Sequence, residues 1–366
     1  MVAGLSAAAF QDLPGWHDDD PTDILNGLKS CARHVKAAKP YKTGQLGLRW
    51  TDFMPAVEAL KTDRRSGAGA ARSFFETHFI PFRIRPQTGG GFVTAYYEPE
   101  LDVSATPDAQ YRYPIHGRPD DLVALNDSNR PANLKQSYAY GRQTGSRIVE
   151  YADRRAIDNG FLDGLGLEIA WAKDRADLFF VHIQGSARLR FPDGNVRRIT
   201  YAAKTGHPFT PIGQVLIDRG ALRQQEVTMQ TIRQWLSDNP QDMDALLWCT
   251  RSYIFFRRAD VDNPDNGPVA AAKVPLVAGR SLAVDKVLHT FGTPIYVEAG
   301  DLTHLDGGPF RRLMLAQDTG SAIVGPARGD IFTGFGAAAG ELAGTVKHPA
   351  TFHMLVPNAA AERLQS

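Results

Sequence analysis

The sequence predicts a mainly β protein with flanking helices, organised in two domains. The chain has 366 residues, of which 43% are hydrophobic and 22% charged, so it can bury a substantial core and exceeds the size of a typical single domain. Its 34 glycines and 23 prolines fit a turn-rich β protein. Short apolar runs separated by Pro, Gly, Asp and Asn fill the middle of the chain, and helical patterns precede and follow them.

The N-terminal part of the chain is predicted to be helical. Apolar residues recur at helical spacing over 24–35, after a capping residue at Thr22, and the ranges 53–60 and 70–79 show the same pattern. The stretch FVTAYYEPE, which starts at Phe92, is the first predicted strand.

Short strands are predicted from about residue 101 to 201. They include LEIAWA, LFFVHIQ and VRRITYA, and PDG at Pro192–Gly194 is predicted to form a hairpin turn. Beyond this block the pattern predicts helices over 211–219, 225–236 and 242–248, and only β structure thereafter.

A β block enclosed by sequence of another character indicates an insertion. We therefore expect an inserted small β domain over 101–203, and a large domain formed by 1–100 and 204–366. The large domain would hold the helical N-terminal part and a segment with three aspartates, 279–334.

Two carboxylates lie in the glycine-rich stretch LMLAQDTGSAIVGPARGDIFTG, Leu313–Gly334. We predict a strand that ends at Asp318, a short strand over 322–324 and a strand that starts at Asp330, an arrangement that can bring both carboxylates together. A carboxyl group partly shielded from water has a raised pKa, so it can protonate a leaving oxygen, as cleavage of a glycosidic bond requires. A lone aspartate beside glycines is more often a turn residue, but a third one, Asp285, follows another β run upstream.

The three aspartates, with LAVD, AQDTGSAIVG and GDIFTG around them, resemble the three-aspartate (3D) domain. Upstream, FVTAYYEPEL, YPIHGRPDDLV, LFFVHIQGSARL, YAAKTGHPFTPIG and SYIFFR occur in the order seen in the membrane-bound lytic murein transglycosylase A family, and the opening AFQDLPGWHDDDP is similar to that family's mature start. The resemblance covers nearly the whole chain. It implies a double-psi β-barrel in the large domain, a smaller β-barrel in the inserted domain, and a substrate groove between them.

The resemblance also implies an activity, lytic cleavage of peptidoglycan. Asp330 would protonate the oxygen of the β-1,4 bond between N-acetylmuramic acid and N-acetylglucosamine, and would then take the proton of the muramyl C6 hydroxyl as that hydroxyl attacks C1. The product would end in 1,6-anhydro-N-acetylmuramic acid. Asp318 would orient Asp330, raise its pKa or bind the sugar, and Asp285 would shape a turn.

Six residues are expected to bind substrate: Thr94, Tyr97, Gln184, Gly185, Ser186 and Tyr253. Those in VTAYYEP lie where relatives contact sugar, although alternating Thr and Tyr is also ordinary strand composition. In HIQGSARL an amide and a hydroxyl flank a glycine that lets a ligand approach the backbone, and a polar turn is the alternative interpretation. The tyrosine of SYIFFR could offer a stacking face, but alternation predicts that part of this aromatic run is core.

Two other classes of function stay open. A non-catalytic protein that binds or loosens the cell wall could use the same fold, and an inverting hydrolase could use Asp318 or Glu341 as the base for water. A net charge of +1, from 41 Lys and Arg against 40 Asp and Glu, argues against a nucleic-acid partner. No cofactor and no metal site is expected, because the histidines stand singly.

The expected location is the periplasm. Residues 1–9 lack the pattern of a secretory signal and no apolar run has the length of a membrane span, so outer-membrane association would depend on a segment removed from a full-length precursor. Cys31 and Cys249 are expected to be small buried hydrophobic residues; neither precedes a mature start as a lipid-bearing cysteine would, and a disulfide between them cannot be inferred. We expect a monomer whose partner is the peptidoglycan glycan strand.

Overall fold

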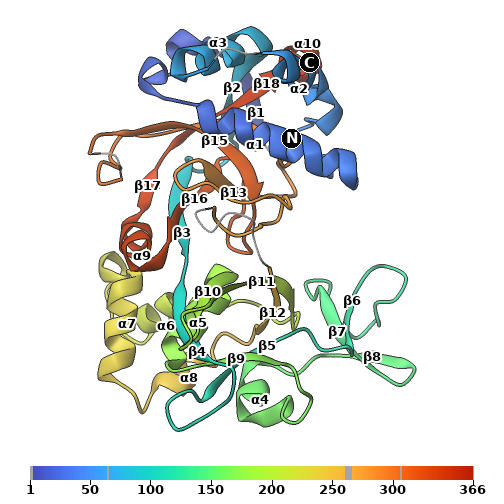
Figure 1. The fold of residues 1–366 in the computed structure, drawn as a ribbon, viewed down its shortest axis with the longest axis vertical. Coiled ribbons are helices and arrows are strands. Elements are labelled where there is room, and N and C mark those ends of the chain that lie inside the picture. The colour runs from blue at the N-terminus through green and yellow to red at the C-terminus, as the bar shows by residue number, and fades with distance from the viewer. Residues whose placement is uncertain (1–2, 64–65, 260–265, 306, 366) are drawn as a thin grey trace. The chain divides into compact units, whose positions relative to one another are not determined.

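The computed structural model describes residues 3–63, 66–259, 266–305 and 307–365, and the chain divides into two compact units. Unit 1 comprises Met1–Tyr97 with Asn263–Ser366, and unit 2 comprises Glu98–Asp262 (Figure 1). Unit 2 therefore interrupts unit 1 in the sequence.

Unit 1 contains a nine-stranded sheet in the order β1-β2-β18-β14-β15-β13-β16-β3-β17. Its strands are β1 (Ala3–Ala7), β2 (Phe79–Pro86), β3 (Phe92–Glu98), β13 (Ser281–Val284), β14 (Pro294–Ala299), β15 (Phe310–Asp318), β16 (Arg328–Phe335), β17 (Lys347–Pro349) and β18 (Thr351–Pro357). The β13–β15 pair is parallel, whereas β14 runs antiparallel to both of its neighbours. The predicted strand over 322–324 does not form, because this stretch is a turn between β15 and β16.

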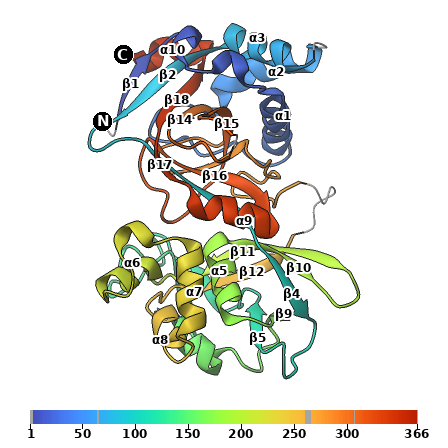
Figure 2. The same ribbon diagram turned by 90° about the vertical axis from the view of Figure 1, so that its left-hand side faces the viewer.

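Unit 1 has four helices near the end of its sheet formed by β1, β2 and β18 (Figure 2). They are α1 (Thr22–Ala37), α2 (Met54–Thr62), α3 (Ala68–His78) and α10 (Asn358–Gln365). Helices α3 and α10 contact these strands, and α1 contacts β15. Helices α1, α2 and α3 confirm the helices predicted from periodicity. The prediction of only β structure after residue 248 was wrong, because α9 (Gly336–Thr345) and α10 are helices. Both are rich in alanine, the residue with the highest helix propensity.

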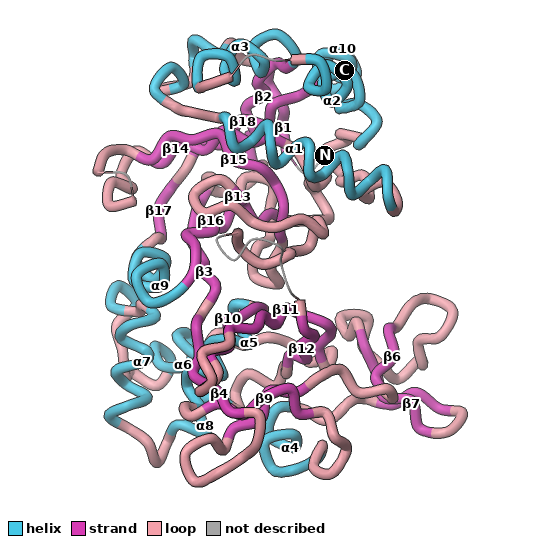
Figure 3. Tube along the Cα trace, viewed as in Figure 1, coloured by secondary structure: helices cyan, strands magenta, loops and turns pink. Residues whose placement is uncertain are grey.

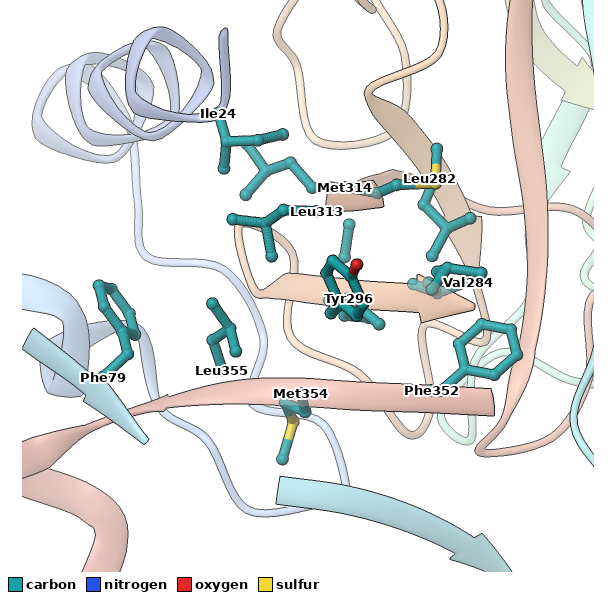
Figure 4. Close-up of a cluster of buried hydrophobic side chains, with 14 of the residues drawn as sticks. Ile24, Phe79, Leu282, Val284, Tyr296, Leu313, Met314, Phe352, Met354 and Leu355 are labelled. Carbon is teal, nitrogen blue, oxygen red and sulfur yellow. The ribbon is translucent and has the colours of Figure 1, made fainter. Parts of the chain in front are cut away.

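One part of the core of unit 1 lies between helix α1 and the sheet (Figure 4). Ile24 of α1 is buried with Leu313 and Met314 of β15 and Tyr296 of β14. The helix approaches the sheet closely, since a Cβ added at Gly27 would lie 2.6 Å from a methyl carbon of Leu315.

A buried ion pair ties the N-terminal segment to this sheet. Asp19, whose side chain is almost fully buried, lies 2.8 Å from Arg280 Nη2 and accepts a hydrogen bond from the backbone N–H of Leu313 at 2.7 Å. Arg280 also donates to the carbonyl of Leu313 at 3.0 Å. The pair therefore joins three segments that are distant in the sequence.

Unit 2 contains a six-stranded sheet in the order β12-β11-β10-β4-β9-β5 and a three-stranded ribbon, β6-β7-β8 (Figure 3). The strands are β4 (Glu100–Ser104), β5 (Tyr113–His116), β6 (Leu122–Ala124), β7 (Tyr140–Thr144), β8 (Arg147–Val149), β9 (Glu168–Ala172), β10 (Ser186–Arg190), β11 (Val196–Lys204) and β12 (Ile254–Arg258). The helices are α4 (Arg154–Ala156), α5 (Arg175–Gln184), α6 (Ile212–Asp218), α7 (Met229–Asp238) and α8 (Met243–Leu247). The predicted PDG turn joins β10 to β11, with Gly194 at a positive φ of 82°.

The stretch LFFVHIQ was predicted as a strand and is helix α5. Its side chains are buried almost all round, so the apolar run carries no helical periodicity. The helix signals lie at its ends, where the side chain of Asp174 accepts the backbone N–H of Asp177 at 2.8 Å and Gly185 takes a left-handed conformation.

Unit 2 extends beyond the predicted insert, which was placed at 101–203. Strand β12 pairs with β11, so it completes the inserted sheet. Helices α6, α7 and α8 bury apolar residues in one cluster with Phe179 and Phe180 of α5. These contacts place 204–258 in unit 2 instead of the large domain.

The predicted mainly β fold with flanking helices is confirmed, and both sheets are strongly curved. Among the described residues, the strand pairing of each sheet does not close into a barrel. However, Tyr96 on β3 hydrogen-bonds Asp318 on β15, although three strand spacings separate these strands by about 14 Å in a flat sheet. In unit 2 a single bridge between Gly117 and Phe256 links the region of β5 to β12, the two edge strands.

Within the described part of the chain, no helix combines the length and apolar character needed to cross a membrane.

We predict that Asp19→Asn lowers the free energy of unfolding by about 3–5 kcal/mol, because it leaves the buried guanidinium of Arg280 without its counter-charge. Asp18→Asn is the matched control at an exposed neighbour and should change stability by less than about 0.5 kcal/mol. Urea unfolding midpoints measure both, and equal midpoints would show that the ion pair does not anchor the segment.

Candidate active site

Strand β13 lies between the two strands that carry the predicted catalytic pair. Ala283 of β13 is the cross-strand partner of Asp318 on β15 and of Asp330 on β16. The two aspartates therefore flank one residue, as the sequence prediction of neighbouring carboxylates requires.

A β-bulge sets this register. Leu282 pairs with Ala316, but the next residue, Ala283, pairs with Asp318, so Gln317 is an extra residue on β15. Gln317 is buried and its amide oxygen accepts the hydroxyl of Ser281 at 2.5 Å. Without the bulge Asp318 would face the opposite side of the sheet, because side chains alternate along a strand.

Strand β3 presents two hydroxyl groups to these carboxylates. Thr94 Oγ1 donates a short hydrogen bond to Asp330 Oδ1, and Tyr96 Oη donates to Asp318 Oδ2 at 2.8 Å. The ring of Tyr96 packs on Phe332 of β16 with centroids 5.4 Å apart.

The prediction of Tyr97 as a sugar contact is not supported by its position. Thr94 and Tyr97 are three residues apart, so in a regular strand they point to opposite faces. Tyr97 is 6% exposed, and a Cβ added at Gly340 of α9 would lie 2.8 Å from its ring. Tyr96 is the residue that faces the carboxylates, and strand alternation from Thr94 is the signal that identifies it.

Asp330 is partly buried, and nearby charges of both signs act on its pKa. Burial raises the pKa of its carboxyl group to about 6, the hydrogen bond from Thr94 and the charge of Arg328 oppose that rise, and the charge of Asp318 adds to it. About a tenth of such a group is protonated at neutral pH, so it can act first as an acid and then as a base.

Asp318 is held by several donors. Its carboxylate accepts Tyr96 Oη and the backbone N–H of Ala271, the latter at 3.3 Å, and the backbone N–H of Thr319 also lowers its pKa. Burial outweighs these contacts and raises the pKa of Asp318. The pKa of Tyr96 lies well above its ordinary value because of burial and the charge of Asp318, so Tyr96 remains a donor.

Asp285 does not join this pair. Its carboxylate accepts the backbone N–H groups of Val287 and Gly325, each at 2.9 Å. It therefore connects its own turn to the loop that joins β15 and β16, which is the role expected for it.

The other predicted substrate residues belong to unit 2. Gln184 is the last residue of α5 and is half-buried, Gly185 ends that helix with a φ of 79°, and Ser186 begins β10 with 6% exposure. The carbonyl of Gly185 accepts the backbone N–H of Tyr201 at 2.7 Å.

Tyr253 cannot offer an open stacking face. It is 2% exposed, its hydroxyl lies 2.8 Å from His116 Nδ1, and its ring centroid lies 4.4 Å from that of His182. The aromatic side chain that is open beside Gly185 is Tyr201, which is 40% exposed. The sequence alone does not indicate Tyr201, because it becomes a neighbour of Gly185 only through the pairing of β10 with β11.

The remaining ionisable and thiol groups do not extend the site. Among the described residues, no group of three or more His, Cys, Asp or Glu side chains could hold a metal ion. Cys31 in unit 1 and Cys249 in unit 2 are free thiols, and burial raises the pKa of Cys31 to about 11. Cys249 is only half-buried, so the expectation of a buried residue holds for Cys31 alone. Glu341 is exposed on α9.

Comparison with known proteins assigns both parts of the chain. The 3D domain matches residues 280–356, and the MltA specific insert domain matches residues 92–257. A crystal structure of a membrane-bound lytic murein transglycosylase from Agrobacterium tumefaciens is 56% identical, covers 99% of each chain and superposes with a TM-score of 0.94. The chain belongs to the membrane-bound lytic murein transglycosylase A family.

More distant members of the family agree. MltA from Neisseria gonorrhoeae is 32% identical over 97% of this chain and 92% of its own, with a TM-score of 0.79. Membrane-bound lytic murein transglycosylase A of Vibrio cholerae is 30% identical over 72% of this chain, and the match spans 66% of that protein, just under two thirds of its length. The family's insert thus coincides closely with unit 2.

We predict that Asp330→Asn stabilises the protein at neutral pH. The folded-state pKa of about 6 exceeds the ordinary 3.8, so the wild type loses stability as pH rises through about 6, by at most about 3 kcal/mol. Asparagine does not ionise and keeps an oxygen for Thr94, so the variant avoids this loss. The stabilities of wild type and variant should coincide below about pH 4, diverge between about pH 4 and 6, and differ by a constant amount above about pH 6. Parallel curves across this range would show that the pKa of Asp330 is not raised.

Proposed function

We propose that this chain is a peptidoglycan lytic transglycosylase that cleaves the β-1,4 bond between N-acetylmuramic acid and N-acetylglucosamine and leaves 1,6-anhydro ends. The observation that carries the proposal is Asp330, a partly buried carboxyl group with a pKa raised to about 6, in a chain of this family. Asp318 and Tyr96 form a fixed polar neighbourhood beside it.

The proposed reaction needs one acid and no water. Asp330 donates its proton to the glycosidic oxygen as the bond from C1 to that oxygen breaks, and the bond's electron pair goes to the leaving oxygen. The muramyl C6 hydroxyl then forms a bond to C1 and gives its proton to the Asp330 carboxylate, which restores the acid. The nucleophile belongs to the reacting sugar, so its effective concentration is high.

Two features favour this reaction over a two-carboxylate hydrolysis. An inverting hydrolase needs a second carboxylate free to take a proton from water. The carboxylate of Asp318 already accepts hydrogen bonds from Tyr96 and from the backbone of Ala271, which hold it in place. The other candidate base, Glu341, is exposed on the helix that follows β16 and lacks the burial that tunes Asp330.

A binding-only protein is less consistent with the site. Burying an ionisable carboxyl group costs folding free energy at neutral pH, and a protein that only binds glycan gains nothing from that cost. We propose that the active form is a monomer. We place it in the periplasm, where its relatives, named membrane-bound murein transglycosylases, suggest the substrate lies.

On unit 2 we propose that Gln184 and Gly185 bind the glycan, with Tyr201 beside them, whereas Ser186, predicted with them, is only 6% exposed. An amide and a backbone free of Cβ suit the hydroxyl and acetamido groups of amino sugars. An exposed tyrosine ring suits the apolar face of a pyranose, and its neighbour across the backbone hydrogen bond is Gly185.

We predict that digestion of purified peptidoglycan releases muropeptides with 1,6-anhydro ends, each lighter by one water than the hydrolytic product. Mass analysis at initial rate measures this. Glycan acetylated at the muramyl C6 hydroxyl should resist cleavage, because the nucleophile is blocked, whereas a hydrolase has no such requirement. Mostly reducing-end products would replace the proposal with the inverting hydrolase.

We predict that Asp330→Asn loses lysis by at least about 10³-fold while it still binds sacculi, because both proton transfers depend on this one group. Asp285→Asn, at a carboxylate used in a turn, is the control and should retain most turnover if the protein folds. Turnover of Asp330→Asn within tenfold of wild type would remove Asp330 from the reaction.

We predict that Gln184→Ala weakens glycan binding by about tenfold with little change in melting temperature, because a half-exposed polar side chain contributes little to the core. Gln214→Ala, at an exposed glutamine of α6 in the same unit, is the matched control. Calorimetric titration with a chito-oligosaccharide gives the affinities. Unchanged affinity with a large loss of melting temperature would make Gln184 a structural residue.

A further inference from the structure

Arg328 stands beside the catalytic acid but reaches it through a second residue. It lies two positions before Asp330 on β16, so both side chains leave the same face of the strand. Its Nη2 donates to Thr94 Oγ1 at 2.7 Å, its Nη1 donates to the carbonyl of Gly329, and its guanidinium lies over the ring of Phe92 with 5.6 Å to the centroid.

This contact fixes the direction of the hydroxyl bond. A guanidinium has five N–H donors and no acceptor, so toward Arg328 the Thr94 oxygen can only accept. The single hydroxyl hydrogen of Thr94 is then free to donate, and its other partner is Asp330 Oδ1. The two hydrogen bonds therefore share one direction: Arg328 donates to Thr94, and Thr94 donates to Asp330.

This direction selects one oxygen of the carboxyl group. While Oδ1 accepts the hydroxyl of Thr94, the neutral acid carries its own proton on Oδ2, because the carbonyl-type oxygen is the stronger acceptor. We propose that Arg328 is a positioning residue that fixes Thr94 as a donor to Asp330 Oδ1 and thereby assigns the transferable proton to Asp330 Oδ2.

The same two hydrogen bonds also suit the second step of the reaction, in which the Asp330 carboxylate takes a proton. Once Asp330 is ionised, Thr94 stabilises the carboxylate at Oδ1 and leaves Oδ2 open to take a proton back. The charge of Arg328 and the bond from Thr94 both lower the pKa of Asp330 against the effect of burial. A group held at Oδ1 and open at Oδ2 can give and take a proton at one position in space.

The inference rests on the proposed transglycosylase reaction for its catalytic meaning, but the proton positions belong to the protein alone. Neutron diffraction from a perdeuterated crystal at about pH 5, where Asp330 is mainly neutral, tests them directly. We expect deuterium on Thr94 Oγ1 directed at Asp330 Oδ1, and deuterium on Asp330 Oδ2. Deuterium on Oδ1, or a Thr94 hydroxyl directed elsewhere, would overturn the assignment whether or not the protein cleaves peptidoglycan.

A double-mutant cycle tests whether Arg328 acts through Thr94. Arg328→Met and Thr94→Val should each reduce turnover of sacculi by about 10²-fold, the effect of a misplaced catalytic group. If the two residues act through the same hydrogen bonds, the turnover of the double variant should lie within about threefold of that of the less active single variant. A loss that multiplies to about 10⁴-fold would show that Arg328 acts independently, by its charge alone, and would overturn the positioning role.

Conservative variants keep the test decisive if those substitutions unfold the protein. Arg328→Lys retains a donor and a charge, and Thr94→Ser retains the hydroxyl, so both should keep more turnover than Arg328→Met and Thr94→Val. In Thr94→Val the carboxyl carbon of Asp330, followed by ¹³C NMR, should titrate at higher pH than in Thr94→Ser, because the bond that lowers its pKa is lost. Equal titration of the two variants would contradict the proposed bond.

Arg312→Met is the matched control. Arg312 is a half-buried arginine of the same sheet, on β15, and its guanidinium lies over the ring of Phe310 at 5.7 Å, much as Arg328 lies over Phe92. This variant should leave the titration of Asp330 and the turnover unchanged. If wild-type protein cleaves no peptidoglycan, the proposed function fails, and the neutron and NMR results still decide the proton assignment.

Discussion

The β-bulge at Gln317 is the constraint on which the site depends. The extra residue places Asp318 opposite Ala283, so β13 has one catalytic-pair aspartate on each side. A slip of one residue would turn Asp318 away from Tyr96 and bring an amide in its place. The bond from Ser281 to Gln317 satisfies the buried amide oxygen of the extra residue, which makes the bulge a stable part of the sheet.

Curvature of the sheet brings β3 close to the strands that carry Asp318 and Asp330. Two hydroxyl groups from β3 reach two carboxylates on different strands, and Tyr96 reaches the more distant one, Asp318 on β15. Each carboxylate therefore has a donor of defined geometry, although both are partly withdrawn from water. Burial raises the pKa of Asp330, the hydrogen bond from Thr94 and the charge of Arg328 oppose that rise, and the resulting pKa is about 6.

The sequence predicted the parts of this arrangement that depend on composition along one strand. An apolar run before Asp318 and another after Asp330 identified two strand ends, and the family resemblance supplied their roles. The bulge leaves no mark in the sequence, because it is decided by packing between strands that are distant in the chain. The resemblance indicated Tyr97, whereas alternation from Thr94 indicates Tyr96, which bonds Asp318. The burial of Tyr253 depends on His116, which contacts its hydroxyl and lies far away in sequence. Helix α5 was misread for a related reason, since burial on every side removes the periodicity that distinguishes a helix from a strand.

Strand β3 also connects the acid to the rest of the chain. Its residues Thr94 and Tyr96 hold the two carboxylates, and its last residue, Glu98, is fully buried in an ion pair with Arg198 of β11. Burial raises the pKa of Glu98 to about 7, against the charge of Arg198, so this anchor is itself sensitive to its surroundings. Glu98 belongs to unit 2 and Thr94 and Tyr96 to unit 1, so the donors of Asp318 and Asp330 lie only a few residues before the point at which the chain enters unit 2.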